Sequence, residues 1–399
     1  MRSVDAHLQT ILELVEFVHP TARTESVPLS DAAGRVTGSP HLAASQSPPF
    51  DNSAMDGYAV RGADIAGASS TNVVILRVID EAHAGRAATA SVEPGTAIRI
   101  MTGAPLPRGA DAVVAQELVI AREGVAHFAA PAAPGAHVRR AGEDVRVGEL
   151  VLPAHVKLSA RHLAALASAG LSDASVTRVP RVGFLATGDE LVAPGQPLGP
   201  AQIFDSNATY LRAALFALGA EPIDLGRCGD DPAAVRAIVE AAQVDLVVTT
   251  GGASVGERDP VKAALAPAGV EFVNVAMQPG KPQGAGLVAG KPVVSLPGNP
   301  VAVAVSVEMF VGPAVRAMLG LAEPPWQTAR AAASWNCPVG RDQFVPVAFE
   351  GADVVPATSA GSGSHLVARL GVADALAWVA ADVQRVSTGD TVRVRRFTT

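Results

Sequence analysis

Two stretches of the chain carry apolar residues at helical spacing. In the first, Leu8, Ile11 and Val15 recur every three or four positions, and the series stops before Pro20. The second covers residues 158–169 and is closed by a glycine. An apolar stripe along a helix must be buried. We therefore expect these two helices to pack against each other although they lie far apart in the sequence.

The segment between the two helices has the pattern of short strands. Its β-branched runs are separated by glycine and proline turns and cover residues 73–78, 97–101 and 111–119. We predict a β-rich domain over residues 46–139. It would be inserted into a discontinuous helical/linker domain formed by residues 1–45 and 140–180.

Strand-like and helical segments alternate from residue 181 onward. The strand-like runs are residues 182–186, 246–250 and 293–296, and the helical runs are residues 207–218, 232–242 and 300–319. This alternation is typical of a parallel sheet covered by helices on both faces. We predict a three-layer α/β domain over residues 181–324.

A proline-rich linker at residues 322–326 separates this domain from the last part of the chain. Short strands return after it, at residues 344–349 and 392–397, between turns. We predict a small, barrel-like β domain over residues 325–399. The fold class is therefore multidomain α/β plus β.

The composition supports several packed domains and excludes one class of partner. The chain has 399 residues, of which 49% are hydrophobic and 17% charged, which exceeds one ordinary core and argues against disorder. Its net charge of -7 gives no general positive field for nucleic acid. An anionic ligand would need a local basic site.

Cysteine usage and hydropathy indicate the compartment. The two cysteines, Cys228 and Cys337, form no CxxC pair, so neither a disulfide framework nor a zinc site is implied. Acidic residues such as Asp5 interrupt the N-terminal apolar residues, unlike a secretory signal. The apolar stretch 301–307 stops at Glu308, short of the roughly 18 residues that a membrane span needs. We expect a cytoplasmic protein without a membrane partner.

The strongest local signal is a glycine-rich loop after the strand-like run 246–250. The loop contains Gly251, Gly252, Ser254 and Gly256 and closes with Asp259. Glycines let backbone N–H groups converge on phosphate oxygens, and ligands of open α/β sheets bind at the carboxyl ends of strands. The loop has neither the GxxxxGKS/T of a P-loop nor the GxGxxG of a dinucleotide fold. A tight strand-to-helix turn explains it equally well.

Polar residues also stand at other ends of the predicted strands and helices. Glu190 follows the strand 182–186, and Asp205 and Ser206 precede the helix that starts at Asn207. Carboxylates in such places could hold Mg²⁺, which prefers oxygen ligands shared with phosphates. Capping of the helix explains Asp205 equally well.

Two further segments of the α/β part have residues suited to an anion. Lys281 stands between two prolines, so a stiff loop would present its charge to an oxyanion, although a solvated surface lysine has the same pattern. Pro297, Gly298 and Pro300 lie at the start of a helix, whose free N–H groups would face an anion. Helix capping alone also explains this second segment.

The β-rich part contains a dense polar loop at residues 48–59, which includes Asp56. No strand or helix period explains this loop, and loops of this kind often carry function. Thr102 follows a strand-like run in a turn, for which turn chemistry is a sufficient explanation. The nine histidines show no HExxH pair.

Taken together, seven motifs resemble the MoeA family of molybdopterin molybdenumtransferases, which includes the C-terminal domain of gephyrin. The motifs are residues 51–59, 99–105, 140–144, 187–191, 251–259, 279–282 and 297–300. Their order and spacing also match the family. The resemblance implies an elongated homodimer of four-domain subunits, in which the discontinuous domain takes part in dimerisation. The third domain would be similar to molybdopterin adenylyltransferases, and the active cleft would lie between subunits.

The resemblance also implies a reaction, the last step of molybdenum cofactor biosynthesis. Molybdate would be inserted into adenylylated molybdopterin, with Mg²⁺ as cofactor and AMP as the leaving product. A molybdopterin adenylyltransferase is a possible contact partner. Whether tungstate is also accepted does not follow from the sequence.

The family's functional residues carry over by motif. The catalytic set would be Asp56, Thr102, Glu190, Asp231 and Asp259, of which Glu190 and Asp259 would bind the metal. The substrate-binding set would be Gly251, Gly252, Ser254, Gly256, Lys281, Pro297, Gly298, Pro300, Ser206, Arg341 and Ser362, with Ser364 as the alternative to Ser362.

The sequence departs from the family pattern beside Lys281. Gln278 stands where family members often have a second lysine, and Gln283 replaces an apolar or aromatic residue. One contact to the oxyanion is therefore in question, whereas the fold is not.

Two alternative functions remain open on the sequence. The glycine-rich loop is also of the type found in molybdopterin adenylyltransferases, but such enzymes are usually the α/β domain alone. A non-catalytic scaffold that binds a protein partner, as the gephyrin domain does, would not require the acidic residues and the lysine. The domains on either side of the α/β domain argue against the first alternative, and the acidic residues and the lysine argue against the second. Both observations favour the molybdenum-inserting enzyme.

Overall fold

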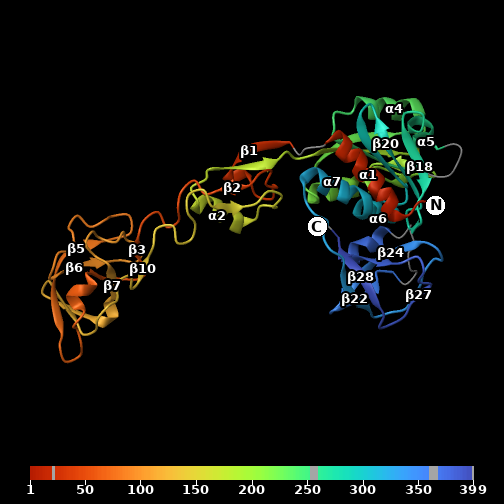
Figure 1. Cartoon of the computed structure of the whole chain (residues 1–399). Helices are drawn as coiled ribbons and strands as arrows, with labels where there is room; N and C mark the ends of the chain where they lie inside the picture. Colours follow the sequence, from red (N-terminus) through yellow and green to blue (C-terminus); the bar gives the residue numbers. More distant parts are fainter. Residues whose placement is uncertain (20–22, 252–258, 359–366, 398–399) are drawn as a thin grey trace.

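The computed structural model describes residues 1–19, 23–251, 259–358 and 367–397. The molecule is elongated, with a β-rich domain at one end and a narrow linker domain in the middle (Figure 1). An α/β domain and a small β-barrel lie together at the other end (Figure 1).

The linker domain is formed by two segments on either side of the β-rich domain. Strand β1 (Thr24–Pro28) pairs antiparallel with β12 (Asp173–Thr177), and β2 (His41–Leu42) pairs with β11 (Leu150–Leu152). A 3-10 turn (Leu29–Asp31) and helix α2 (Ala160–Ser168) complete it. Strands from either side of the β-rich domain thus pair with each other, β1 with β12 and β2 with β11.

The β-rich domain is built on a six-stranded sheet in the order β7-β4-β6-β5-β9-β8. These strands are β4 (Gly57–Val60), β5 (Val74–Ala82), β6 (Thr96–Ile100), β7 (Ala112–Ala115), β8 (Val119–Arg122) and β9 (Val125–Phe128). Two 3-10 turns (Gly62–Ile65 and Gln116–Leu118) and the short pair β3 (Asn52–Ser53) and β10 (Val138–Arg139) complete the domain. Separate apolar clusters pack around Phe128 and around Ile98, and these clusters hold the domain together without the rest of the chain.

The α/β domain has a six-stranded sheet in the order β16-β13-β17-β21-β20-β18. Its strands are β13 (Arg181–Thr187), β16 (Glu221–Cys228), β17 (Leu246–Thr250), β18 (Val270–Asn274), β20 (Pro282–Val288) and β21 (Lys291–Leu296). The helices are α3 (Ser206–Ala217), α4 (Pro232–Ala241), α5 (Pro260–Leu265), α6 (Pro300–Ser306) and α7 (Gly312–Leu319), and β14 (Leu191–Val192) pairs with β15 (Ile203–Phe204) outside the sheet.

The prediction of a purely parallel sheet is wrong at one strand. β16, β13, β17 and β21 are parallel, but β20 runs antiparallel to β21 and to β18. Two residues, Ala289 and Gly290, connect β20 to β21, and both have positive φ angles (48° and 76°). A two-residue turn of this kind joins antiparallel neighbours, whereas a parallel crossover needs a much longer connection.

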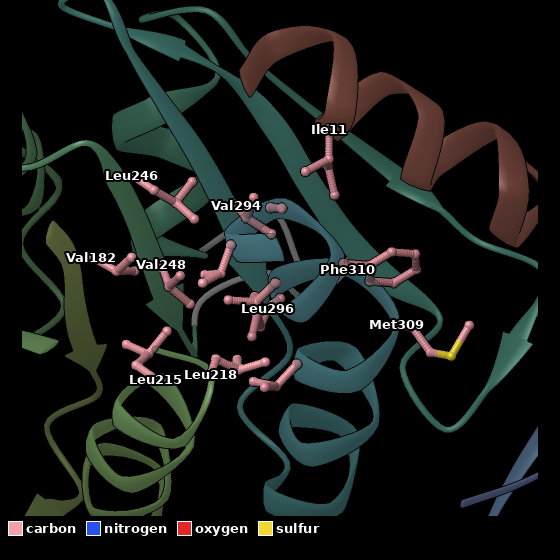
Figure 2. Packing of buried hydrophobic residues seen from close by; sticks show 14 of the residues in the cluster. Ile11, Val182, Leu215, Leu218, Leu246, Val248, Val294, Leu296, Met309 and Phe310 are labelled. Atoms are coloured by element: carbon pink, nitrogen blue, oxygen red, sulfur yellow. The ribbon is translucent and has the colours of Figure 1, made fainter. Parts of the chain in front are cut away.

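The expected packing of the first helix against the helix at residues 158–169 is also wrong. Helix α1 (Val4–Val18) lies on the α/β domain, in contact with α7, β20 and β21, while α2 belongs to the linker domain (Figure 1). Ile11 points into the same apolar cluster as Val294 and Phe310 (Figure 2). The apolar face of α1 is thus buried as predicted, but its partner is the sheet and α7.

The helix predicted over residues 300–319 is confirmed, and it continues past Glu308, where its apolar stretch is interrupted. Helix α6 continues through a π-helical turn (Val307–Val311) into α7, and this turn places Pro313 in the first turn of α7, where its missing N–H breaks no helical hydrogen bond. Among the described residues, Pro300–Leu319 is the helix with the length and composition of a membrane span. It forms the core of the α/β domain, because 94% of the apolar window is buried inside the protein.

The last part of the chain is a closed five-stranded barrel, as the barrel-like prediction required. Its strands are β22 (Gln327–Ala331), β24 (Asp342–Glu350), β25 (Asp353–Pro356), β26 (Ala375–Val379) and β28 (Thr391–Arg396). The ring closes because β24 pairs with both β25 and β26, β26 with β28, β28 with β22, and β22 with β25. A short pair, β23 (Trp335–Asn336) with β27 (Arg385–Val386), and a 3-10 segment (Val367–Val372) lie beside it.

A charged network fixes the barrel to the α/β domain. Arg316 of α7 donates two hydrogen bonds to Glu323 at 2.6 and 2.9 Å, and Arg395 of β28 donates to the same carboxylate at 3.3 Å. Arg395 also donates to the carbonyl oxygen of Glu308 at 2.7 Å. Both arginines are buried. Loss of any of these contacts would leave a buried charge without a partner and would destabilise the junction.

Candidate functional site

One edge of the α/β sheet gathers most of the predicted site residues. Parallel strands end on the same side of a sheet, so β16, β13, β17 and β21 all end at this edge, and the antiparallel strand β20 begins there. We call it the C-terminal edge. The segments at this edge contain Asp231 after β16, Glu190 after β13, Gly251 after β17, Pro297 and Gly298 after β21, and Lys281 before β20.

The backbone is unusually close-packed at the centre of the C-terminal edge. Gly251 has a φ of 83°, and a Cβ there would collide with the carbonyl oxygen of Thr187. A Cβ on Gly298 would lie 3.2 Å from the Cα of Gly251. The backbones of Gly251 and Gly298 therefore lie in direct contact beside the end of β13, and glycines at such a place let main-chain N–H groups approach an anion.

Helix N-termini add to the same edge. Asp205 caps α3 by accepting from the N–H of Ala208 at 2.9 Å, and Asp231 caps α4 by accepting from the N–H of Ala233 at 2.9 Å. Ser206 and Pro300 are the first residues of α3 and α6. The positive ends of these helices favour a negatively charged ligand at this edge.

The two predicted metal ligands have different surroundings. Asp259 is buried and caps α5, accepting from the N–H of Lys262 at 3.1 Å. Glu190 is exposed, and its carboxylate folds back over Gly188, where a Cβ would collide with it. Within the described parts of the chain, no group of three His, Cys, Asp or Glu residues could hold a metal ion.

The lysine loop connects the C-terminal edge to the barrel. Strand β19 (Met277–Gln278) pairs in parallel with the beginning of β24, and the N–H of Asp342 donates to the carbonyl oxygen of Ala276 at 2.9 Å. Arg341 directly precedes Asp342, so its segment lies against the loop that carries Lys281. The structure thus brings these two predicted anion contacts into neighbouring segments.

Asp56 and Thr102 lie together in the β-rich domain. One carboxylate oxygen of Asp56 accepts hydrogen bonds from the main-chain N–H and from the hydroxyl of Thr102, both at 2.7 Å. These two bonds hold the pKa of Asp56 below its usual value, with the main-chain bond as the largest cause. The pair belongs to the β-rich domain, which lies at the other end of the molecule from the α/β domain (Figure 1), so a single chain does not bring all five predicted catalytic residues together.

Four of the predicted substrate-binding residues cannot be placed. Gly252, Ser254 and Gly256 lie in the segment 252–258, and Ser362 lies in the segment 359–366, together with Ser364. Both segments are outside the described residues.

The sequence reasoning missed side chains that shape the C-terminal edge. Asn207 donates from Nδ2 to the carbonyl oxygen of Gly298 at 2.8 Å, and the hydroxyl of Thr187 donates to the carbonyl oxygen of Thr250 at 3.2 Å. The buried hydroxyl of Thr250 has no hydrogen-bond partner within the described chain. Asn207 and Thr187 lie within or beside motifs already singled out, but no sequence pattern indicates that their side chains connect one segment of this edge to another.

This arrangement defines an α/β protein whose sheet gathers glycines and helix N-termini at one edge, and to which a distant β-rich domain and a barrel are attached. Sequence profiles identify its relatives. The profile described as "MoeA N-terminal region (domain I and II)" matches residues 2–170, "Probable molybdopterin binding domain" matches residues 183–317, and "MoeA C-terminal region (domain IV)" matches residues 328–397. The chain belongs to the MoeA family of molybdopterin molybdenumtransferases.

Individual relatives cover the whole chain. Molybdopterin molybdenumtransferase 2 of Mycobacterium tuberculosis is 40% identical over 405 residues and covers 99% of each sequence. Molybdopterin molybdenumtransferase of Haemophilus influenzae is 36% identical over 407 residues, covering 100% of this chain and 99% of the relative. The crystal structure of a molybdopterin biosynthesis MoeA protein from Pyrococcus horikosii superimposes with a TM-score of 0.86 at 34% identity, covering 98% of this chain and 99% of the other.

These comparisons confirm the family, the fold class and the class of enzyme inferred from the sequence. They favour neither of the alternatives, the adenylyltransferase or the scaffold, because the full-length relatives carry the name of the molybdenum-inserting enzyme. The assignment of individual site residues remains a prediction.

Proposed function

We propose that this chain inserts molybdate into adenylylated molybdopterin and releases AMP, the last step of molybdenum cofactor biosynthesis. One observation supports this proposal most strongly. The C-terminal edge combines a side-chain-free meeting of Gly251 and Gly298 with the N-termini of α3, α4 and α6, which suits a pyrophosphate. Lys281 stands beside it at the start of β20 and suits a second, smaller anion.

The proposed roles follow from this placement. Main-chain N–H groups at Gly251 and Gly298 would bind the phosphates of the adenylylated pterin, and Ser206 and Pro300 would contribute the helix ends. Lys281 and Arg341 would bind molybdate next to the dithiolene of the pterin. Arginine binds an oxyanion with a planar fork and lysine with a point charge, so the two contacts would complement each other.

Mg²⁺ would be the cofactor, held by Glu190 and Asp259. Two carboxylates with oxygen ligands from the substrate's phosphates are a common way to bind this ion, which keeps a largely solvated shell of six oxygens. When bound, it would neutralise charge that develops on the AMP leaving group. Asp259 is held in place as a helix cap, so its carboxylate would not need to be ordered by the ion.

A second copy of the chain would complete the site. Asp56 and Thr102 are remote from the C-terminal edge of their own chain, so we place them over the edge of the partner in a homodimer. A molybdopterin adenylyltransferase would be the protein that delivers the substrate. The free thiols of Cys228 and Cys337 suit the reducing cytosol, where we place the reaction.

A direct assay tests this function. Purified protein is incubated with adenylylated molybdopterin, Mg²⁺ and sodium molybdate, and AMP is followed with and without the oxyanion. We expect AMP release that depends on molybdate. ATP-dependent adenylylation of free molybdopterin would indicate an adenylyltransferase instead, and a stable dimer that releases no AMP under any of these conditions would indicate a scaffold.

A further inference from the structure

Gln283 is a buried polar residue directly beneath the lysine loop. It lies in β20 and is completely buried. Its Nε2 donates two hydrogen bonds, one to the carbonyl oxygen of Gly280 and one to the hydroxyl oxygen of Ser306, both at 2.8 Å. Its Oε1 is buried and has no partner within the described chain.

The bond to Gly280 fixes the direction of the next peptide group. The Gly280–Lys281 peptide is trans, so its N–H points away from its carbonyl oxygen. Because Gln283 holds that carbonyl inward, the main-chain N–H of Lys281 is directed outward. Across the described residues, neither this N–H nor the exposed ammonium of Lys281 meets a hydrogen-bond acceptor. Lys281 therefore offers two donors.

The bond to Ser306 connects the loop to a second anion-binding element. Ser306 is the last residue of α6, and the first residue of α6 is Pro300 at the C-terminal edge. Gly280 has a φ of 103°, and a Cβ there would come within 3.3 Å of both Gln283 and Ser306, so the loop is packed closely on this pair. The side chain of Gln283 thus spans from the lysine loop to the helix.

We propose that Gln283 is a positioning residue for the oxyanion. It holds the Gly280–Lys281 peptide against Ser306 at the C-terminal end of α6, so that both donors of Lys281 face the molybdate. This inference rests on the proposed function and adds to it a residue that does not touch the substrate. It also gives a reason for the departure from an apolar residue at this position.

Stability alone does not account for the glutamine. A buried carbonyl oxygen without a donor lowers stability, whereas an apolar side chain of similar size would bury the same space without that loss. Replacement by leucine removes this loss but leaves the buried carbonyl oxygen of Gly280 and the buried hydroxyl of Ser306 without their donor, so the two effects oppose each other and we expect only a small change in melting temperature. The glutamine's two bonds join Gly280 of the loop to Ser306 of α6, so its removal should affect anion binding.

The test compares kinetic constants of wild type, Gln283→Leu and Ser306→Ala, with Ser295→Ala as matched control. Ser295 accepts a buried hydrogen bond from Thr249 in the same sheet but does not contact the lysine loop. Loss of a hydrogen bond of ordinary strength corresponds to about a fivefold weaker interaction. We expect Gln283→Leu to raise KM for molybdate about fivefold with kcat within about twofold, Ser306→Ala to have a smaller effect of the same kind, and Ser295→Ala to leave KM unchanged.

Amide hydrogen exchange of residues 275–285 gives a second measurement that does not require activity. Without Gln283 the loop should open more readily, so exchange at Val275, whose N–H donates to the carbonyl oxygen of Lys281 at 2.7 Å, should become about tenfold faster in Gln283→Leu than in wild type. Unchanged exchange would overturn the proposal, as would a lower melting temperature and lower kcat with unchanged KM. If the wild type releases no AMP in response to molybdate, the proposed function fails, and exchange alone then decides whether Gln283 positions the lysine.

Discussion

At the scale of single residues, the aspartates of the C-terminal edge have two possible uses. Asp205, Asp231 and Asp259 each cap a helix, as the sequence pattern allowed for Asp205. Capping explains their geometry but does not require a charge, because asparagine caps a helix as well as aspartate does. Replacing the carboxylate with an amide therefore separates the two uses.

Asp259→Asn should abolish AMP release while the protein remains folded. The amide oxygen can still accept from the N–H of Lys262, so we expect a melting temperature within about 2 °C of wild type. The proposed Mg²⁺ site loses its charged ligand, so we expect at least about a hundredfold lower kcat/KM. Asp205→Asn is the matched control, a buried cap at the same edge that is not one of the two proposed Mg²⁺ ligands. A stable Asp259→Asn protein with full activity would refute the metal role.

At the scale of elements, the packing of α1 makes the stability of the protein depend on pH. His7 lies on its buried face, and its ring stacks edge-on against Phe310 with 4.9 Å between ring centroids. Burial, and then the charge of Arg2, lower the pKa of His7 from 6.5 to about 4. Neither ring nitrogen has a hydrogen-bond partner among the described residues. The folded protein therefore keeps the neutral imidazole.

The sign of the pH effect follows from this lowered pKa. Between about pH 6.5 and 4 the unfolded chain binds a proton at His7 that the folded chain does not, so stability falls as the pH falls through this window. We expect the contribution of His7 to be about 2 kcal/mol smaller at pH 5 than at pH 7.5. Urea unfolding of wild type and His7→Leu at both pH values measures it, and the variant should lose correspondingly less stability. The exposed His83→Gln is the control; an identical pH slope in wild type and His7→Leu would contradict the prediction.

The sequence predicted the positions of helices and strands better than it predicted which of them pack against one another. β17 was predicted with its observed bounds, because five consecutive β-branched or leucine residues form a strand buried on both faces. β16 was not recognised, since half of its residues are exposed at the edge of the sheet, and neither was β20, because its PQGAGLV sequence lacks a strand signal. The apolar face of α1 was clear, but periodicity cannot say which surface covers it.

The grouping of the candidate site residues could be predicted where it follows from strand order, but not where it depends on an unforeseen strand direction or on detailed packing. Residues at the ends of consecutive parallel strands meet by topology, so Glu190, Gly251 and Gly298 could be grouped from the strand pattern alone. Lys281 reaches the same edge only because β20 runs antiparallel, which the sequence analysis did not foresee. The contact of Asn207 with Gly298 depends on the exact packing of α3 and could not be predicted.

At the scale of the whole molecule, the elongated shape separates two halves of the proposed site. The pair Asp56 and Thr102 is at one end, and the C-terminal edge is at the other (Figure 1). Each domain has its own apolar core, so the separation reflects the architecture of the linker domain, where paired strands β1 and β12 join the two ends. In a two-fold dimer each chain would contribute its β-rich domain to the edge of the other.

Mixed dimers test this arrangement. We expect Asp56→Asn and Asp259→Asn to be inactive as separate proteins, whereas a heterodimer of the two would contain one site built from two intact halves. Random mixing makes half of the dimers hetero-pairs with one good site each, so activity should recover to about a quarter of wild type. Co-expression with two different affinity tags isolates the hetero-pair, which should reach about half of wild-type kcat per dimer. A chain that used its own Asp56 would leave every site with one altered residue, and the hetero-pair would then be as inactive as its parents.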